Sequence, residues 1–387
     1  MKEEMKEIPL LPEGGANIPL FKPHIPATAL EEIADTLGSR WIGQGPKVER
    51  FEKLFAERFC NSDPGIAVGS GTDALHLAYL LAGVESGDEV ITPLFTCTAT
   101  NIPLLYIGAK PVFVDVEPET LNIDTDKIEK LITSRTKAIV CVHYGGLACN
   151  MEKILSIAQK YGLKVIEDAA HAVGAKYNNS YIGTISDFTM FSFQAIKHIT
   201  TGDGGYLSFK NPDLLEKAKS LRWFGIDRSK KQLGIWENDI TEIGYKYQMT
   251  DIAASLGIAG LREFDSTLNM RRALMARYLQ NIEENEFVQI LSKEKSNTVH
   301  AAWLFTIKCK ERRLLQKTLF ENGIESNQVH YRNDRYAIFA DSKGSFPSMD
   351  ALEDEYLVLP LHTHMTLDDI DRISTIINMH GRKLNEK

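Results

Sequence analysis

Short apolar runs alternate with amphipathic stretches through the first two thirds of the chain. The runs lack polar alternation, and the amphipathic stretches between them repeat with the period of a helix. Strands of this kind are buried on both faces, which is typical of a mainly parallel sheet covered by helices. We therefore predict an α/β fold. The expected strands are 66–68, 89–91, 111–114, 138–142, 164–166, 187–193 and 205–208, and the expected helices are 74–82, 98–106, 126–132 and 151–161.

The two ends of the chain follow other patterns. The first seventeen or so residues resemble a polar arm, and the stretch 26–59 is helical apart from a glycine-rich loop at 41–46. After about residue 261, long helical periodicity is followed by a strand near 303–309, a helix, and a final helix over 367–379. Because 387 residues exceed what one domain usually holds, we expect three parts. These are an N-terminal arm (1–20), a large domain (21–260) and a small C-terminal α/β domain (261–387).

Composition narrows the class of protein. The chain is 43% hydrophobic and 25% charged, as in ordinary globular proteins, and its net charge of −8 argues against nucleic-acid partners and anionic membrane surfaces. We find no apolar run that fits a signal peptide or a membrane span. The five cysteines, at 60, 97, 141, 149 and 309, are scattered without zinc-site spacing. We expect a reduced, cytoplasmic chain without disulfides.

Four polar segments directly follow or precede predicted strands, where doubly wound sheets bind their ligands. The first is Ser70-Gly71-Thr72, between a strand and a helix. Glycine permits close approach of a ligand to the backbone, and the helix start offers free N–H groups to a phosphate. Helix capping by Ser70 or Thr72 explains the same pattern equally well.

The second segment is an acid pair, Glu167-Asp168, at the end of a buried strand. Burying a carboxylate costs free energy unless a cation pairs with it, and a protonated pyridinium nitrogen would be such a cation. A salt bridge and metal ligation are the alternatives. We disfavour a metal, because no other Asp, His or Cys stands at ligand spacing nearby in the sequence.

The third and fourth segments follow one another. Lys197 stands a few residues beyond an apolar strand, with the hydroxyl of Ser192 five positions before it. A desolvated lysine suits Schiff-base chemistry, and Ser192 is placed to bond a phosphate, although a single lysine here would ordinarily be an exposed loop residue. Gly202 to Gly205 precedes a strand instead of opening a helix, so a tight turn explains it better than a dinucleotide site.

In this order, the motifs resemble the DegT/StrS family of sugar aminotransferases, which share the type I fold of pyridoxal 5′-phosphate (PLP) enzymes. The resemblance covers nearly the whole chain. It implies a large PLP-binding domain with a mainly parallel, seven-stranded sheet between helices. The matching segments are Gly45 with Val48 and Phe51-Glu52, Ser70–Thr72, Gly87–Ile91, Glu167–Ala172, Ser192-Phe193 with Lys197, Thr201–Gly205, Gly244-Tyr245, Met249–Ala254 and Leu359–His362.

The resemblance also implies roles for single residues. Lys197 would carry PLP as a Schiff base, the internal aldimine, and then act as the proton shuttle. Asp168 would pair with the pyridinium nitrogen, and His171 would lie beside the ring, unless it is merely a satisfied buried histidine. Ser70, Gly71, Thr72 and Ser192 would hold the phosphate.

Two positions depart from the family pattern. Many relatives have a ring-stacking aromatic residue where this chain has Cys97. Either a neighbour such as Phe95 or His143 covers the ring, or the packing is looser. Lys246 stands where relatives often have an asparagine that reaches the partner's cofactor phosphate across a dimer. If Lys246 does the same, the protein is a homodimer with shared active sites.

The run from Gln328 to Tyr336 is rich in donors and aromatic rings, and in relatives this region lines the substrate side. Arg332 or Arg335 would meet a pyrophosphate, and His330 and Tyr331 complete the expected substrate residues. A solvated polar loop is the alternative for each of them.

The resemblance therefore implies a PLP-dependent aminotransferase. It would move the amino group of L-glutamate to a 3- or 4-keto-6-deoxy sugar on a nucleoside diphosphate, for O-antigen-type surface glycans. The branch of the family that dehydrates such sugars has histidine at the lysine position, so Lys197 disfavours that reaction. A non-catalytic regulatory protein with the same fold is the remaining alternative.

Overall fold

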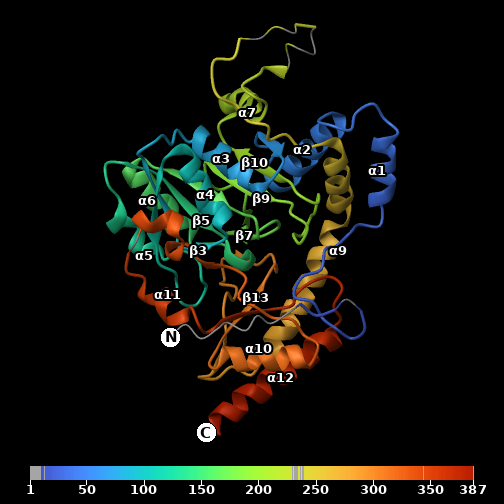
Figure 1. The fold of residues 1–387 in the computed structure, drawn as a ribbon, viewed down its shortest axis with the longest axis vertical. Helices are drawn as coiled ribbons and strands as arrows, with labels where there is room; N and C mark the ends of the chain where they lie inside the picture. The colour runs from blue at the N-terminus through green and yellow to red at the C-terminus, as the bar shows by residue number, and fades with distance from the viewer. Residues whose placement is uncertain are drawn as a thin grey trace.

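A seven-stranded sheet forms the centre of the larger part of the molecule (Figure 1). The structure is a computed structural model, and it describes residues 10–12, 14–228, 230, 234–235, 237, 239–342 and 344–386. The strand order is β1-β10-β9-β6-β5-β2-β4, and β10 is the one strand that runs antiparallel to its neighbours. The strands are β1 (Gly65–Val68), β2 (Glu89–Pro93), β4 (Lys110–Val114), β5 (Thr136–Val142), β6 (Lys164–Asp168), β9 (Phe188–Ser192) and β10 (Gly205–Phe209).

Helices cover both faces of this sheet, because successive strand residues point to opposite sides. In β6, for example, Val165 joins the core under α2, α5, α6 and α9, whereas Ile166 joins the core under α3, α4 and α7. These helices are α2 (Pro46–Phe59), α3 (Gly71–Leu81), α4 (Thr98–Ile107), α5 (Thr125–Ile128), α6 (Met151–Tyr161), α7 (Leu215–Arg222) and α9 (Asp251–Asn281); α1 (Ala29–Leu37) packs beside α9.

A second, smaller sheet lies toward the C-terminus, in the order β11-β13-β15. Its apolar face packs with α10, α12 and the end of α9. The elements are β11 (Val288–Ile290), β13 (Phe305–Cys309), α10 (Arg312–Glu321), α11 (Pro347–Leu352), β15 (Tyr356–Leu359) and α12 (Leu367–Asn385). Two small groups of short strands complete the described strands. One joins β7 (Lys176–Tyr177) to β8 (Ser180–Tyr181) and β12 (Thr298–Val299), and the other joins β3 (Phe95–Thr96) to β14 (Tyr331–Arg332).

Three connections join the two parts. Helix α9 packs against α2 near its start and against α12 near its end, and Figure 1 shows it passing from one part to the other. Ile18 of the N-terminal segment forms a bridge with Ile324. The β3–β14 pair brings residues 331–332 beside residues 95–96. Segments far apart in the sequence therefore meet where the two parts touch.

The predicted fold class is confirmed, and all seven predicted strands of the large sheet are present. The predicted domain boundary after residue 260 falls inside the continuous helix α9, and the division into domains stays a prediction. The arm is described from residue 10 onward apart from residue 13. Among the described helices, none is both long enough and apolar enough to span a bilayer.

Candidate active site

A cup of backbone and hydroxyl groups lies where β1 meets α3. Ser70 caps the helix, its Oγ accepting a hydrogen bond of 3.1 Å from the amide of Asp73. Gly71 and Thr72 are the first two helical residues, so their amides precede the first intrahelical bond. Ser192, at the end of β9, faces them: a Cβ on Gly71 would come 3.1 Å from the Ser192 Cβ. The capping interpretation is thus correct, and the free amides suit a phosphate.

Gly205 explains part of the glycine-rich turn at 202–205. A Cβ at Gly205 would lie 2.4 Å from the carbonyl oxygen of Ser70 and 2.8 Å from the Gly71 amide. Any larger residue would therefore push β10 away from the turn that begins α3. This glycine is required for the close approach of two backbones, and it holds the phosphate cup in shape.

Asp168 is a buried carboxylate at the end of β6. Its Oδ2 accepts 2.7 Å from the hydroxyl of Thr100, and its Oδ1 accepts 3.1 Å from the Ala170 amide. Burial raises the pKa of Asp168, and these two hydrogen bonds and the positive charge of Lys197 only partly oppose it. A cationic nitrogen in front of the carboxylate would complete its partners.

Lys197 lies in the segment that follows β9, and its side chain is half-buried. Burial lowers the pKa of the Lys197 amine to about 7, although Asp168 and Cys97 act in the opposite direction. A large fraction of the amine is therefore neutral, and hence nucleophilic, near neutral pH. Lys197 and Asp168 are thus close enough for each to change the ionisation of the other.

His171 pairs with His330 beside these groups. The Nδ1 of His171 accepts the amide N–H of Gly145 at 3.3 Å, so its Nε2 carries the proton and donates to His330 Nε2 at 3.3 Å. Burial lowers the pKa of both rings, to about 3 for His330. Both histidines are therefore neutral. His171 has a partner at each ring nitrogen, and its catalytic role stays a prediction.

Trp303, the aromatic residue beside Lys197, was not among the site residues predicted from the sequence. Its ring stacks on His171 with 3.7 Å between centroids, and the Lys197 Nζ lies 3.6 Å from the centroid of the Trp303 ring. The backbone before it is in the left-handed region, with φ of 53° at Ala302. The buried guanidinium of Arg271 donates 3.0 Å hydrogen bonds to the carbonyls of Ala302 and Trp303. No periodic signal in the sequence marks such a turn.

Cys97 is exposed at the start of α4. The two side chains that could replace a stacking aromatic ring at this position are both buried. Phe95 is buried between Tyr144 and Tyr356, and His143 has no exposed surface. Whether one of them covers the cofactor ring or the packing there is looser stays a prediction.

The segment 330–335 divides between the site and a structural cluster. His330 contacts His171, and Tyr331 is 45% exposed and pairs with Thr96, next to Cys97. Arg332 points the other way, since neighbouring strand residues face opposite sides. Its side chain is 6% exposed and is held by Asp334, Asp350 and Glu353.

Arg335 is mostly exposed and forms an ion pair with Glu353. The structure therefore brings His330 and Tyr331 toward the candidate site and gives Arg332 a set of carboxylate partners. That set disfavours a pyrophosphate role for Arg332, and the four substrate roles stay predictions.

Lys246 is exposed and lies over the ring of Trp223, 3.6 Å from its centroid. Its Nζ also donates to Gln248 at 2.9 Å. The next residue, Tyr247, accepts the Gly69 amide through its carbonyl at 2.7 Å, so this segment runs beside the phosphate cup of its own chain. Whether Lys246 reaches a partner's cofactor stays a prediction.

The residues fit PLP. A cup of free helix amides and Ser192 suits the phosphate, the buried Asp168 carboxylate suits a protonated ring nitrogen, and the partly neutral Lys197 amine suits a covalent bond to the aldehyde. The three features come from the starts or ends of neighbouring elements, α3, β6 and β9, at one edge of the sheet.

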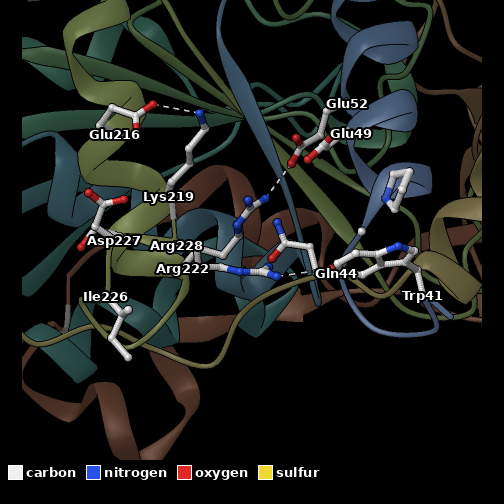
Figure 2. Close-up of a pocket in the computed structure, with 13 residues that line it drawn as sticks. Trp41, Gln44, Glu49, Glu52, Glu216, Lys219, Arg222, Ile226, Asp227 and Arg228 are labelled. Atoms are coloured by element: carbon white, nitrogen blue, oxygen red, sulfur yellow. Dashed lines mark hydrogen bonds and ion pairs between the residues drawn. The ribbon is translucent and has the colours of Figure 1, made fainter. Parts of the chain in front are cut away.

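A separate pocket of about 400 Å³ opens between α2, α7 and the loop before α2 (Figure 2). Its cations already have protein partners: Arg222 bonds Glu52 at 2.6 Å, Lys219 bonds Glu216 at 2.8 Å, and Arg228 donates to the Gln44 carbonyl at 3.4 Å. The residues predicted for the cofactor are not among its described lining. We do not assign the cofactor to this pocket.

Comparison with known proteins gives consistent similarities. The model of the DegT/DnrJ/EryC1/StrS aminotransferase family matches residues 23–378. The chain is 39% identical to the uncharacterized protein MJ1066 of Methanocaldococcus jannaschii, covering 91% of this chain and 95% of that protein. It is 34% identical to GDP-perosamine synthase of Escherichia coli O157:H7, covering 93% and 98%.

A solved structure is similar along the same length. Spr1654 from Streptococcus pneumoniae, in its PMP form, has a TM-score of 0.89 and 30% identity, covering 95% of this chain and 100% of that one. A PLP form of the same protein is also similar, with a TM-score of 0.88. The similarity therefore extends across both parts of the fold.

Proposed function

Because the chain belongs to the DegT/DnrJ/EryC1/StrS aminotransferase family and is a PLP-dependent sugar aminotransferase, we propose that it aminates a keto sugar carried by a nucleoside diphosphate. We propose L-glutamate as the amino donor and a 3- or 4-keto-6-deoxy sugar as the acceptor. The amino sugar would serve in surface-glycan assembly of the O-antigen type. A cytoplasmic location belongs to the same proposal.

One observation carries the assignment of the chemistry to this site. The amine of Lys197, with a pKa of about 7, lies near the buried carboxylate of Asp168. A lysine with an ordinary pKa would be almost fully protonated and unreactive at neutral pH. The lysine at this position also disfavours the dehydration that relatives with histidine here perform.

Each residue has a task that follows from its surroundings. When bound, PLP supplies the carbonyl that receives the amino group and a ring that withdraws electrons from the reacting carbon. Asp168 holds the proton on the ring nitrogen, and Thr100 fixes the orientation of that carboxylate. Lys197 would move a proton between the α-carbon of the donor and C4′ of the cofactor, because its amine changes charge near neutral pH.

The substrate side rests on two kinds of support. Tyr331 lies on the β3–β14 pair and His330 directly precedes it, and their phenol and imidazole lie beside the candidate site, where they would meet sugar hydroxyls. The similarity to GDP-perosamine synthase supports a nucleotide-linked sugar. Arg335, which is mostly exposed, is the better candidate of the two arginines for the pyrophosphate.

We also propose a homodimer in which Lys246 of one chain meets the cofactor phosphate of the other. The cationic Nζ is exposed and would bind a phosphate as a point charge. If so, Lys246→Ala would weaken PLP binding without changing the mass of the assembled particle. Analytical ultracentrifugation and a PLP titration measure the two effects separately.

A panel of nucleotide-linked keto sugars, assayed with L-glutamate, tests the proposed reaction. We expect one amino sugar and one 2-oxoglutarate per turnover with a 3- or 4-keto-6-deoxy substrate. A deoxygenated sugar without amine would instead indicate dehydration.

A control in the same assay tests the regulatory alternative. Protein that binds no PLP, judged by the absorbance of the lysine-bound cofactor, would support a non-catalytic role. Borohydride reduction followed by mass spectrometry should place the cofactor on Lys197, and the label should disappear in Lys197→Ala.

A further inference from the structure

Three side chains with metal-binding atoms converge behind the candidate active site. Cys141 is near the end of β5, and His143 and Cys149 follow in the loop that leads to α6. One ligand atom from each lies within 4.8 Å of the other two. All three side chains are essentially buried, at 0%, 0% and 1% exposure. We expected no metal site from the sequence because the cysteines lack zinc-site spacing, but the fold brings the ligand atoms of these three residues close together.

Both ring nitrogens of His143 have hydrogen-bond partners, and Nδ1 is the one on the side of Cys149. Its Nε2 lies 2.9 Å from the Oε2 of Glu167, and its Nδ1 accepts the amide N–H of Cys149 at 3.1 Å. The proton is therefore on Nε2, and the lone pair is on Nδ1. Histidine ligands of metals commonly donate their other N–H to a carboxylate in this way, which fixes the tautomer. A bound ion would take over the lone pair that the Cys149 amide now shares.

Glu167 is itself held firmly in place. Its Oε1 accepts hydrogen bonds from the hydroxyls of Ser186, at 2.5 Å, and Thr189, at 3.1 Å. The carboxylate is completely buried. The carboxylate orients the imidazole, and the hydroxyl groups orient the carboxylate. Metal-binding histidines commonly have an outer shell of this kind.

Sulfur dominates the remaining surroundings. The thiol of Cys141 lies 3.8 Å from the thioether sulfur of Met151, and the thiol of Cys149 lies 3.1 Å from the carbonyl oxygen of Val142. Thiolate and imidazole ligands favour borderline and soft ions such as Zn²⁺ over Mg²⁺ or Ca²⁺.

A cavity gives access from the surface to Cys149. It has a volume of about 160 Å³ and includes Cys149 in its lining. Glu117 and Glu152 also line it, together with the amides of Asn122 and Asn150. Carboxylates at the entrance favour the approach of a cation. Lys295, which pairs with Glu117 at 3.6 Å, is the opposing charge.

We propose that Cys141, His143 and Cys149 bind one Zn²⁺ ion. Binding would convert the two thiols to thiolates and release two protons to solvent. The ion would be held by two sulfur atoms and one nitrogen, with a water molecule from the adjoining cavity as the fourth ligand. The three protein ligands match a Cys₂His set. The proposal is independent of the reaction assigned to the chain.

The ion would stabilise the part of the sheet that presents Asp168. The amide of His143 donates to the carbonyl oxygen of Asp168 at 3.2 Å, and Glu167 directly precedes Asp168 in the chain. A metal on His143 would therefore tie the ends of β5 and β6 together. Its role is to position Asp168, and the ion itself would not touch substrate.

The experiment uses the full-length, PLP-loaded enzyme after treatment with a chelator. Zn²⁺ is added in a calorimetric titration, and Co²⁺ is added separately to record the visible d–d bands of a tetrahedral thiolate site. Cys141→Ser and Cys149→Ser remove one ligand each. Cys309→Ser is the matched control, because Cys309 is equally buried but lies in the small sheet.

We expect one Zn²⁺ per chain, tetrahedral Co²⁺ bands, and a higher unfolding temperature with Zn²⁺. Each ligand variant should lose more than about 100-fold in affinity, since changes in the outer shell alone weaken metal sites roughly 10- to 100-fold. Cys309→Ser should bind Zn²⁺ like the parent chain even if its unfolding temperature falls.

Two results would overturn the proposal. One is Zn²⁺ binding that is unchanged in Cys141→Ser and Cys149→Ser. The other is a parent enzyme that binds no Zn²⁺ although all of its thiols are titratable after unfolding. Activity is not needed for either readout, so failure of the proposed reaction would leave this test intact.

Discussion

The hydroxyl of Thr100 donates a 2.7 Å hydrogen bond to Oδ2 of Asp168. Both residues are buried, so water does not compete for this bond. Thr96 in turn lies 2.8 Å from the Thr100 hydroxyl. Because Thr100 donates to the carboxylate, it accepts from Thr96, and the chain of hydroxyls ends on Asp168. The ionised form of Asp168 therefore depends on Thr100 as well as on the cofactor.

Replacing Thr100 by valine should weaken PLP binding by roughly 10- to 100-fold, because a hydrogen bond to a charged group contributes about 1.5–3 kcal/mol. A fluorescence titration with PLP measures the change. Thr92→Val is the matched control: Thr92 is also buried, and its hydroxyl bonds Asn101 instead of Asp168. Equal losses in the two variants would show that Thr100 acts only through packing.

The rate at which cofactor-free enzyme captures PLP should depend on pH with a midpoint near 7, the pKa of Lys197. Only the neutral amine attacks an aldehyde, so the rate should rise as pH increases toward the midpoint and level off above it. Stopped-flow absorbance across the pH range measures this. A rate that continues to climb toward pH 10 would mean that the lysine has its ordinary pKa.

Replacing Trp303 by leucine should shift that midpoint to lower pH by about half to one pH unit. A cation over an indole ring is stabilised by about 0.5–2 kcal/mol, and loss of that stabilisation favours the neutral amine. Trp303→Phe keeps an aromatic ring at the position whose indole centroid lies 3.6 Å from the Lys197 Nζ, and it should shift the midpoint less. Identical midpoints in the leucine variant and the parent chain would exclude the cation–π contact as a determinant.

Arg332→Met should lower the free energy of unfolding by about 3 kcal/mol, because it leaves Asp334, Asp350 and Glu353 facing one another without their shared cation. The KM for the nucleotide sugar should stay unchanged. Denaturant unfolding and steady-state kinetics measure the two quantities.

Arg335→Gln provides the comparison. Arg335 is 61% exposed on its side chain, so its loss should change stability by less than about 1 kcal/mol. If it meets the pyrophosphate, KM should rise. The reverse pattern, with KM rising only in the Arg332 variant, would reassign the substrate contact.

The strands of the large sheet were predictable because burial on both faces leaves a plain apolar signature. Val165 and Ile166 enter opposite cores, so neither position tolerates a polar residue. The candidate site was predictable in part for the same reason. Asp168 is the last residue of a buried strand, and Ser70 and Lys197 follow the ends of other apolar strands.

Other features depend on contacts that leave no local signal. Strand β14 contains two residues and pairs with β3 more than 230 positions away, so no periodicity marks it. Trp303 is positioned by a left-handed turn that Arg271 holds through two carbonyl groups. The direction of Arg332 is decided by the same short pairing, which turns Tyr331 and Arg332 to opposite sides.

Helix α9 has a mechanical consequence. It runs for 31 residues without a break, a length of about 46 Å at 1.5 Å per residue. Its first half is anchored by Leu261 and Phe264 in one core and its second half by Leu274 and Tyr278 in another. A hinge at residue 261 would have to bend a continuous helix whose two halves are packed in two cores. The distance that the helix spans between the two cores is therefore fixed.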